Sequence, residues 1–549
     1  MITSFLLYYR TLIFLKPIQI YYRIWFKFVK PKIKDRSLPD LREHKEIFIE
    51  PAPKNISFID KDTFIFLNKI GKKSILGWND SENKVSRLWR YNQHYFDGLN
   101  ASFSNPSEDS WHNEIILSWI AENPIGIGTG WESYPLSLRI VNWIKWQLLG
   151  NKLSKESLES LAIQTRYLEK RIEWHILGNH IIANAKALVF SGLFFSGNEA
   201  NKWLKKGIEI LFVQIKEQIL DDGGNFERSP MYHSIVLEDL LDLINISSTF
   251  KGIIPNNHHI LWMHKVKKML TWISSMIHPD GEIAFFNDSA IGIAPSPSSL
   301  FSYAKRQFIE YENFDSEFVN FSQSGYIKVK SDEATTFIDV APIGPDYIPG
   351  HAHADTLSFE LSIFDSRIFI NGGTYEYEDT NIRAYQRSTK AHNTVSIDNE
   401  NSSEVWNSFR VARRAFPKNL KINRGNGDLS VSSAHNGYDR LKGKPTHNRC
   451  WKFSSKSLSI KDCIQGSFKI ANAYFHLHPS IVISQKDRRQ FILSAPNGKL
   501  INFKVLKGNA RLETSYFSPE FGKKIQTNCI NISFVDSISH VLISWSSNA

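Results

Sequence analysis

The apolar residues of this chain change their spacing at about residue 312, and this change most constrains what the chain can fold into. From about Trp89 to Ala304 they recur three and four positions apart, the spacing of one face of an α-helix. Beyond residue 312, short segments alternate apolar and polar residues, which is typical of strands that bury one face. The sequence therefore predicts a helical domain followed by a β domain.

Five strongly periodic segments make up the helical half, and turn-forming residues separate them. The segments are 138–144, 182–195, 208–219, 235–246 and 261–277. After the Pro- and Ser-rich stretch at 294–299, we expect one last helix that ends near Tyr311. Long helices joined by polar loops indicate an α/α toroid or solenoid, although the sequence shows no repeat of fixed period.

The second half contains short strand-like segments and no helical pattern between them. They are 326–330, 357–364, 367–370, 394–397, 457–460 and 530–534. Such a run of short strands predicts an antiparallel sandwich. Because 549 residues exceed what one core supports, we divide the chain into an N-terminal extension (1–60), a helical domain (61–312) and a β domain (313–549).

Basic residues concentrate at the amino terminus. Residues 1–34 hold seven Lys or Arg and nine aromatic residues but no Asp or Glu. Arg10 and Lys16 interrupt the apolar run and no small-residue cleavage motif follows, so we recognise no secretory signal. No stretch is long enough to span a membrane. Two interpretations stay open: a helix on a membrane surface, or a strap packed on the next domain.

The rest of the chain is almost balanced in charge. Of a formal net charge of +11, the other 515 residues hold 59 basic and 55 acidic residues. No basic stripe carries a known nucleic-acid-binding motif, so nucleic acid is not an expected partner. Three cysteines cannot build a disulfide framework. The charge alone therefore says little about an acidic substrate.

Two segments of the helical half are richer in polar residues than packing requires. Asn179 and His180 open an apolar helix, where a helix cap with a buried histidine is the alternative interpretation. The glycine-hinged loop 221–233 leads to Tyr232 at the start of another helix. Such loops often carry function, although a single tyrosine is more often structural.

Two histidine-containing segments stand out in the β half. If residues 351–361 form a strand, His351, His353 and Asp355 share one face, which is also the expected core face. Unpaired burial of such groups is costly, so a metal site or a catalytic pocket is favoured. His353 and His392 with an oxygen donor, Asn371 or Asp355, would suit Zn²⁺. A neutral Asn is a poorer ligand than a carboxylate.

Taken together, these motifs resemble the heparinase II/III-like polysaccharide lyases. The resemblance covers roughly residues 85–480 and preserves the order of the family's motifs. It implies an incomplete α/α toroid followed by an antiparallel β-sandwich, with a cleft between them. The matching stretches are 130–143, Leu177-Gly178-Asn179-His180, Ser229-Pro230-Met231-Tyr232-His233, Gly350-His351-Ala352-His353-Ala354-Asp355 and His392-Asn393-Thr394-Val395.

The resemblance also implies roles for single residues. Asn179, helped by His180, would neutralise a uronate carboxylate, and Tyr232 and His351 would transfer protons in a β-elimination. His353, Asn371 and His392 take the metal-site positions, for a structural zinc. Two departures from the family matter: Asn225 stands where relatives commonly have His, and Asn371 stands where some have a carboxylate.

Three further residues are candidates for binding an acidic polysaccharide. Trp131 and Tyr134 would line the sugar cleft and Arg139 would counter acidic groups, although packing in the toroid core is the alternative for the aromatic residues. The elimination requires no cofactor, and the sequence contains no nucleotide-binding glycine motif. The expected function is a lyase that cleaves a uronate-containing bacterial surface or extracellular glycan.

Two other functions remain open. One is a non-lytic protein of the same fold that binds a polysaccharide or takes part in its biosynthesis. The other is a metal-dependent glycan hydrolase or deacetylase that uses His351, His353 and His392, although Thr356 stands where such hydrolases often have a second His after the Asp. By resemblance the protein belongs in a bacterial cell envelope or periplasm; without a recognised export signal, a cytoplasmic or membrane-peripheral place stays open. The sequence predicts no oligomeric state.

Overall fold

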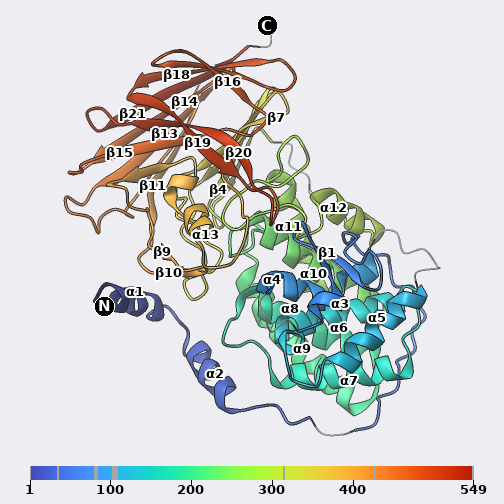
Figure 1. The fold of residues 1–549 in the computed structure, drawn as a ribbon. Coiled ribbons are helices and arrows are strands. Elements are labelled where there is room, and N and C mark those ends of the chain that lie inside the picture. The colour runs from blue at the N-terminus through green and yellow to red at the C-terminus, as the bar shows by residue number, and fades with distance from the viewer. Residues whose placement is uncertain are drawn as a thin grey trace.

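The computed structural model describes residues 2–33, 36–79, 84–101, 109–312, 316–425 and 428–546. Helices fill the first half of the chain and strands the second (Figure 1), which confirms the order expected from the hydrophobic spacing. The change falls between Arg306, where the last long helix ends, and Phe318, where the strands begin. The predicted boundary at residues 312 and 313 touches 313–315, which lie outside the described residues.

Helices α6 and α8 to α11 correspond to the five periodic segments predicted from the sequence, and α7 was not predicted. A short hairpin and small helices precede them. In chain order the elements are α1 (Ile2–Leu12), α2 (Pro17–Phe28), β1 (Thr63–Phe66), β2 (Lys69–Lys72), α3 (Lys73–Leu76), α4 (Arg87–Tyr95), α5 (Asp109–Glu122), α6 (Ser133–Leu148), α7 (Lys155–Lys170), α8 (Gly178–Phe194), α9 (Gly197–Gln218), α10 (Pro230–Thr249), α11 (Asn256–Ser275) and α12 (Pro297–Arg306).

Helix α12 ends five residues before the expected end at Tyr311. Gln307 caps the helix, and Phe308 then adopts a φ of 57°. A left-handed residue ends a helix because the following residues cannot continue the α-helical hydrogen bonds. The expectation of a longer helix was therefore wrong at its C-terminal end.

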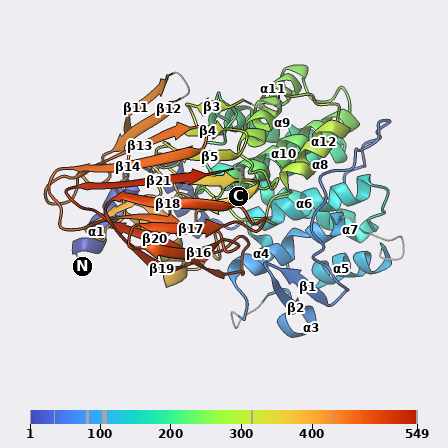
Figure 2. The ribbon, with the colours of Figure 1, turned by 90° about the horizontal axis from the view of Figure 1, so that it is seen from above.

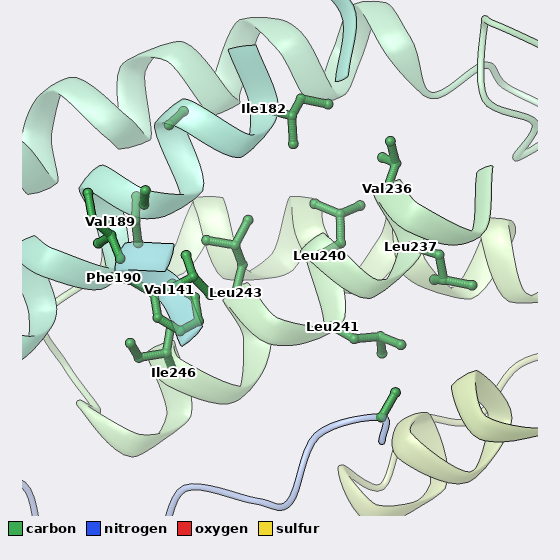
Figure 3. Close-up of a cluster of buried hydrophobic side chains, with 14 of the residues drawn as sticks. Val141, Ile182, Val189, Phe190, Val236, Leu237, Leu240, Leu241, Leu243 and Ile246 are labelled. Carbon is green, nitrogen blue, oxygen red and sulfur yellow. The ribbon is translucent and has the colours of Figure 1, made fainter. Parts of the chain in front are cut away.

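Helix α8 lies inside the helical domain, because it is largely apolar and buried on nearly every side. Small residues let it approach α9 closely: a Cβ on Gly207 of α9 would lie 2.8 Å from the Ala185 carbonyl oxygen of α8. On another side it packs with α10, and Figure 3 shows side chains of both helices in one apolar cluster. Labelled members are Val141, Ile182, Val189, Phe190, Val236, Leu237, Leu240, Leu241, Leu243 and Ile246.

The β half consists of antiparallel sheets of eight, five and four strands, which stack beside the helices (Figure 2). The five-stranded sheet contains, in order, β3 (Phe318–Phe321), β4 (Tyr326–Lys330), β5 (Ala334–Asp339), β6 (Phe359–Ile363) and β7 (Ser366–Phe369). The four-stranded sheet contains β19 (Asn509–Phe517), β20 (Ile525–Ser533), β15 (Ala471–His476) and β8 (Val395–Ile397). The eight-stranded sheet runs β11 (Pro417–Arg424), β12 (Leu429–His435), β13 (Thr446–Ser454), β14 (Ser457–Gln465), β21 (Ile538–Trp545), β18 (Leu500–Lys507), β17 (Gln490–Ser494) and β16 (Val482–Asp487). Every second residue of β13, β14 and β21 is buried, and these side chains share one core with the other two sheets.

The prediction that His351, His353 and Asp355 lie on a strand was wrong. Strand β6 begins only at Phe359. Leu357 has a φ of 63°, which interrupts extended backbone. Residues 351–358 instead form a loop whose backbone bonds to other segments: Asp288 N–H donates to the His351 carbonyl oxygen at 2.9 Å.

The N-terminal helices are packed across both halves of the molecule. Helix α1 lies on a small hairpin of β9 (Val405–Trp406) and β10 (Arg410–Val411), where the Trp406 indole N–H donates to Thr11 Oγ1 at 3.1 Å. Helix α2 lies on the helical domain, where Gln19 donates to the Ile176 carbonyl oxygen at 3.1 Å. None of the described helices combines the length and apolar character needed to cross a membrane.

The buried contacts of α10 give a test of the helical core. Leu243 is fully buried, so Leu243→Ala should lower the free energy of unfolding by about 2–5 kcal/mol through lost burial and a residual cavity. Val213 is 57% exposed, and Val213→Ala should change the free energy of unfolding by less than about 0.5 kcal/mol. Equal losses in chemical denaturation of both variants would contradict this description of the core.

Candidate active site

A pocket of about 830 Å³ lies between the helical domain and the β half. Helices α4, α6, α8 and α10 supply one wall, and β-half loops around residues 347–351, 377–378 and 409–411 supply the other. The inner sides of α1 and α2 also line it. Of the residues predicted from the sequence, the pocket brings together Tyr134, Asn179, His180, Tyr232 and His351.

Two predicted substrate-binding residues lie elsewhere. Arg139 is fully buried, donates to Gln164 at 2.9 Å and lies 3.7 Å from the centre of the Trp119 ring. Trp131 is buried as well, and its indole N–H donates to the Asn123 carbonyl oxygen at 3.1 Å. Both residues build the wall of the helical domain, so the interpretation of them as substrate contacts is corrected here.

Asn179 and His180 stand in the first turn of α8, which opens into the pocket. Leu177 and Gly178 adopt φ values of 71° and 60°, and this sharp turn aims the helix start at the pocket. The Asn179 Oδ1 has no hydrogen-bond partner among the described residues. An amide N–H of the Asn179 side chain and the helix dipole both favour negative charge at this end, so the helix start can bind a carboxylate.

His180 carries positive charge over a wider pH range than an ordinary histidine. Burial alone would lower the pKa of His180, but the Glu173 carboxylate, 3.2 Å from its Nδ1, raises that pKa above the usual value. The Tyr134 ring packs against the imidazole, with ring centres 4.4 Å apart. His180 therefore adds a fixed cation beside Asn179.

Tyr232 and His351 line the same pocket as this helix start, and they contact each other. Their rings are stacked with centres 3.8 Å apart, and the Tyr232 hydroxyl lies 3.0 Å from that of Tyr377. Burial raises the pKa of Tyr232 well above its usual value. Tyr232 is therefore a neutral phenol that can donate a proton, next to an imidazole that can accept one.

A buried carboxylate, Asp288, holds this histidine in place. His351 Nδ1 lies 2.9 Å from Asp288 Oδ2, and Arg383 forms a two-pronged ion pair with the same carboxylate. Burial alone would raise the pKa of Asp288, but Arg383, His351 and His353 hold it well below the usual value. Asp288 is therefore ionised, and His351 Nδ1 must donate to it. This leaves Nε2 free to act as a base.

Glu227 is a second carboxyl group that the sequence did not single out. Its Oε1 accepts from the Asn179 backbone N–H at 3.3 Å, and its Oε2 lies 3.8 Å from His351 Nε2. Burial raises the pKa of Glu227. The group thus lies between the helix start and the proton-transfer pair.

Weak signals for some of the missed residues were present in the sequence. Glu227 belongs to the glycine-hinged loop already noted, and Asp288 lies in a polar triplet directly after the apolar run 283–286. Tyr377 and Arg383 carry no local signal, since ordinary surface loops contain both residue types. Their role follows only from the fold, which brings them to Tyr232 and Asp288.

His353 and His392 form a buried pair behind the pocket. Their facing nitrogens, His353 Nδ1 and His392 Nε2, are 3.0 Å apart. The outer nitrogens lie 2.8 Å from Asp288 Oδ1 and 2.7 Å from the Ser388 carbonyl oxygen. Both outer partners are acceptors, so both outer nitrogens must donate. When the rings are neutral, two lone pairs face each other.

This arrangement fits a bound cation. Burial lowers the pKa of His353 to about 4 and also lowers that of His392, so a shared proton is weakly held near neutral pH. Two lone pairs that face one another, each fixed by an outer hydrogen bond, are the ligand arrangement of histidine metal sites. Zinc takes such nitrogen ligands.

The third predicted metal position is less well matched. Asn371 is buried, its Oδ1 accepts from the Asn393 backbone N–H at 3.3 Å, and its Nδ2 has no hydrogen-bond partner among the described residues. No group of three His, Cys, Asp or Glu side chains that could hold a metal occurs in the described ranges. His353 and His392 would therefore be the strong ligands, with Asn371 as a weak oxygen ligand.

Models of known protein families match both halves of the chain. The family model described as Heparinase II/III N-terminus matches residues 16–314, and the one described as Heparinase II/III-like, C-terminal matches residues 315–546. Together they cover nearly all of the chain. The chain belongs to the heparinase II/III family.

Curated relatives in this family are heparin-sulfate lyases. One from Bacteroides stercoris is 25% identical over 346 residues, which are 59% of this chain and 47% of the relative. One from Pedobacter heparinus is 25% identical over 367 residues, 59% of this chain and 53% of the relative. The chain thus spans about half the length of the curated relatives it matches.

Solved structures show the same fold. The crystal structure of heparinase III has a TM-score of 0.68 at 18% identity, covering 84% of this chain and 77% of that one. A mutant heparan sulfate lyase from Pedobacter heparinus has a TM-score of 0.60 at 18% identity, covering 86% and 79%. The similarity confirms the predicted fold class, an incomplete α/α toroid followed by an antiparallel β-sandwich.

The raised pKa of His180 predicts how stability depends on pH. A histidine whose folded pKa lies above its unfolded value stabilises the protein below about pH 6.5, and this contribution disappears as the pH rises through the folded pKa. The Tm difference between the wild type and His180→Gln should therefore be larger at about pH 6 than at about pH 9. Thermal unfolding in both buffers measures it.

His175 provides the matched control. Burial lowers the pKa of His175 to about 4. Its contribution to the stability of the folded protein therefore falls as the pH drops below about 6.5. The Tm difference for His175→Gln should accordingly change with the opposite sign. If both variants respond to pH in the same way, the ion pair of His180 with Glu173 is not as described.

Proposed function

We propose that the protein is a polysaccharide lyase that cleaves a uronate-containing chain by β-elimination. One observation carries the proposal: the helix start at Asn179 and His180 and the stacked Tyr232–His351 pair line a single pocket, where Glu227 lies beside both. An elimination needs both parts, because the proton removed lies next to the carboxylate that must be neutralised. The heparin-sulfate lyases among the relatives support the same reaction class.

The helix start would bind the uronate carboxylate. When the proton on C5 leaves, negative charge spreads onto this carboxylate. The Asn179 amide, the His180 cation and the α8 dipole would then stabilise the additional negative charge that develops on the carboxylate in the transition state. Preorganised donors of this kind stabilise the transition state without rearranging.

His351 would remove the C5 proton. Its Nδ1 donates to the ionised Asp288, which fixes the tautomer and leaves the Nε2 lone pair as the base. The electrons of the broken C5–H bond form the C4–C5 double bond, and the bond between C4 and the bridging oxygen breaks. Such a positioned base contributes on the order of 10²–10⁴-fold to the rate.

Tyr232 would protonate the departing oxygen. Its hydroxyl remains protonated because burial opposes the phenolate. After donation, the stacked His351, which now carries the C5 proton, can return it to Tyr232. The Tyr377 hydroxyl, 3.0 Å away, orients the phenol. The cycle then needs neither an oxidant nor a cofactor.

The charges in the pocket favour a substrate that carries carboxylates rather than dense sulfate. Six lysine and arginine side chains line the pocket, and four of them are paired: Lys54 with Glu238 at 2.7 Å, Lys145 with Asp242 at 2.5 Å, Lys186 with Asp239 at 2.8 Å and Arg87 with Glu132 at 2.6 Å. Arg23 and Arg410 form no ion pair with the described residues. Paired lysines have little capacity to neutralise further anions. We therefore propose a sparsely sulfated uronate polysaccharide as the substrate.

We further propose that His353 and His392 bind one zinc ion, with Asn371 as a weak third ligand. The ion would have a structural role: it would hold the loop that carries His351, through the bonds that both histidines of this loop make to Asp288. The side chains that line the pocket, and not the zinc ion, would carry out the elimination.

Two substitutions test the lyase proposal. Tyr232→Phe and His351→Ala should each lower the kcat for formation of the unsaturated product by about 10²–10⁴-fold, because each removes one proton-transfer group. The ultraviolet absorbance of the unsaturated product is the readout. Matched controls are Tyr516→Phe and His540→Ala, which lie outside the pocket and should retain full activity.

The substrate panel should contain alginate, hyaluronan, unsulfated chondroitin and heparan sulfate. Activity on an unsulfated member above that on heparan sulfate agrees with the proposed substrate class, and the reverse preference contradicts it. Full activity of both Tyr232→Phe and His351→Ala would exclude the assigned roles. Binding of a polysaccharide without any unsaturated product would indicate a non-lytic protein.

Elemental analysis of the purified protein tests the zinc proposal. We expect about one zinc per chain, and loss of the metal together with a lower Tm after dialysis against a chelator, since bound metal stabilises the folded state. The double variant His353→Gln and His392→Gln should contain no zinc. A metal content near zero in the wild type would contradict the proposal and leave a hydrogen-bonded pair.

A further inference from the structure

Helices α1 and α2 expose most of their large apolar side chains. On α2, Gln19, Tyr22 and Phe26 face the protein, whereas Ile24 and Phe28 are exposed, Phe28 to 82%. Helix α1 is similar, and Phe5 is 71% exposed. The exposed set is Phe5, Leu6, Tyr8, Tyr9, Leu12, Ile13, Ile18, Ile20, Tyr21, Ile24, Trp25, Phe28 and Val29.

This apolar surface is concentrated in one place. Thirteen of the 35 exposed large apolar side chains among the described residues lie between Phe5 and Val29. Single exposed apolar residues are normal, but a contiguous group indicates an interaction surface. Tyr8 and Leu12 line the active-site pocket, and we name the other eleven side chains the N-terminal apolar face.

Positive charge accompanies the N-terminal apolar face. Lys27, Lys30 and Lys32 are exposed next to it, and residues 1–34 contain no Asp or Glu. Arg23 is exposed as well, but it lines the pocket. The other two basic residues of the helices and their connection are used internally. Lys16 pairs with Glu217 at 2.5 Å, and Arg10 lies 3.6 Å from Glu404.

We propose that α1 and α2 bind the surface of an anionic lipid bilayer. Aromatic and aliphatic side chains with a basic border are the pattern of helices that lie in the membrane interface. Exposed lysines and arginines add attraction to anionic headgroups. A second copy of the chain fits less well, because a pair of these faces would bring basic borders together without an acid to neutralise them.

The lengths of the helices agree with lying on the membrane rather than crossing it. Helices of 11 and 12 residues extend about 17–18 Å at 1.5 Å per residue. The hydrocarbon core of a bilayer is about 30 Å thick. In Figure 1 both helices lie at one border of the molecule, with α1 beside β9 and β10, so a flat surface can approach them.

Membrane binding through this face would place the active-site pocket at the lipid surface. Thr11 and Gln19 line the pocket from the same two helices whose outer sides carry the apolar face. Gln19 also donates to the Tyr347 carbonyl oxygen at 3.2 Å, which ties α2 to a loop of the pocket. The bound protein would thus meet a polysaccharide at the membrane.

Vesicle co-sedimentation of the full chain tests the proposal. We expect binding to phosphatidylcholine–phosphatidylglycerol vesicles at low salt, at least about tenfold weaker binding to pure phosphatidylcholine, and loss of binding at high salt. The triple variant Ile20→Ser, Ile24→Ser, Phe28→Ser should bind the vesicles at least about tenfold more weakly, because it removes apolar area that the membrane would bury. The triple variant Lys27→Gln, Lys30→Gln, Lys32→Gln should show a similar loss of affinity for anionic vesicles.

A matched control removes exposed apolar residues elsewhere. Ile70, Ile75 and Phe308 are 68%, 67% and 91% exposed, and their combined replacement by Ser should leave vesicle binding unchanged. Circular dichroism and thermal unfolding verify that every variant is folded. Absence of wild-type binding to anionic vesicles would overturn the proposal. So would a dimer in analytical ultracentrifugation that the Ile20, Ile24 and Phe28 variant abolishes, since the face would then join two copies.

Discussion

One buried carboxylate, that of Asp288, holds the functional centre together. It lies in a loop of the helical half, and it binds three side chains of the β half: His351, His353 and Arg383. An unpaired charge at full burial would be very costly, so these partners stabilise the ionised carboxylate inside the protein. The same contacts join the two halves of the molecule and set the tautomer of His351.

Opposite Asp288, the start of α8 supplies the complementary charge. Asn179 and His180 meet the pocket with the positive end of the helix dipole, and Glu173 and Glu227 lie behind them. In the proposed lyase, this helix start would bind the substrate carboxylate beside the proton-transfer pair. The three lysines that line the pocket are paired with carboxylates.

Much of the fold followed from local patterns, and so did part of the site. The spacing of apolar residues predicted helices α6 and α8 to α11 because each buries a face that neighbouring residues define. Motifs pointed to Asn179, Tyr232 and His351. The prediction of a strand through His351 was wrong because bonds to distant segments, such as that from the Asp288 backbone, replace strand pairing there. Arg139 proved to be internal because Gln164 and Trp119 enclose its guanidinium.

The sequence by itself determined the order of a helical and a β domain, the basic aromatic amino terminus and the residue types of the proton-transfer pair, since all three depend on neighbouring residues. Only the tertiary structure decided that Asp288, Tyr377 and Arg383 belong to the site, because loops far apart in the chain bring them together. It also decided which way the amino-terminal helices face. Their residues are apolar on nearly every side, so the sequence could not distinguish the packed face from the exposed one.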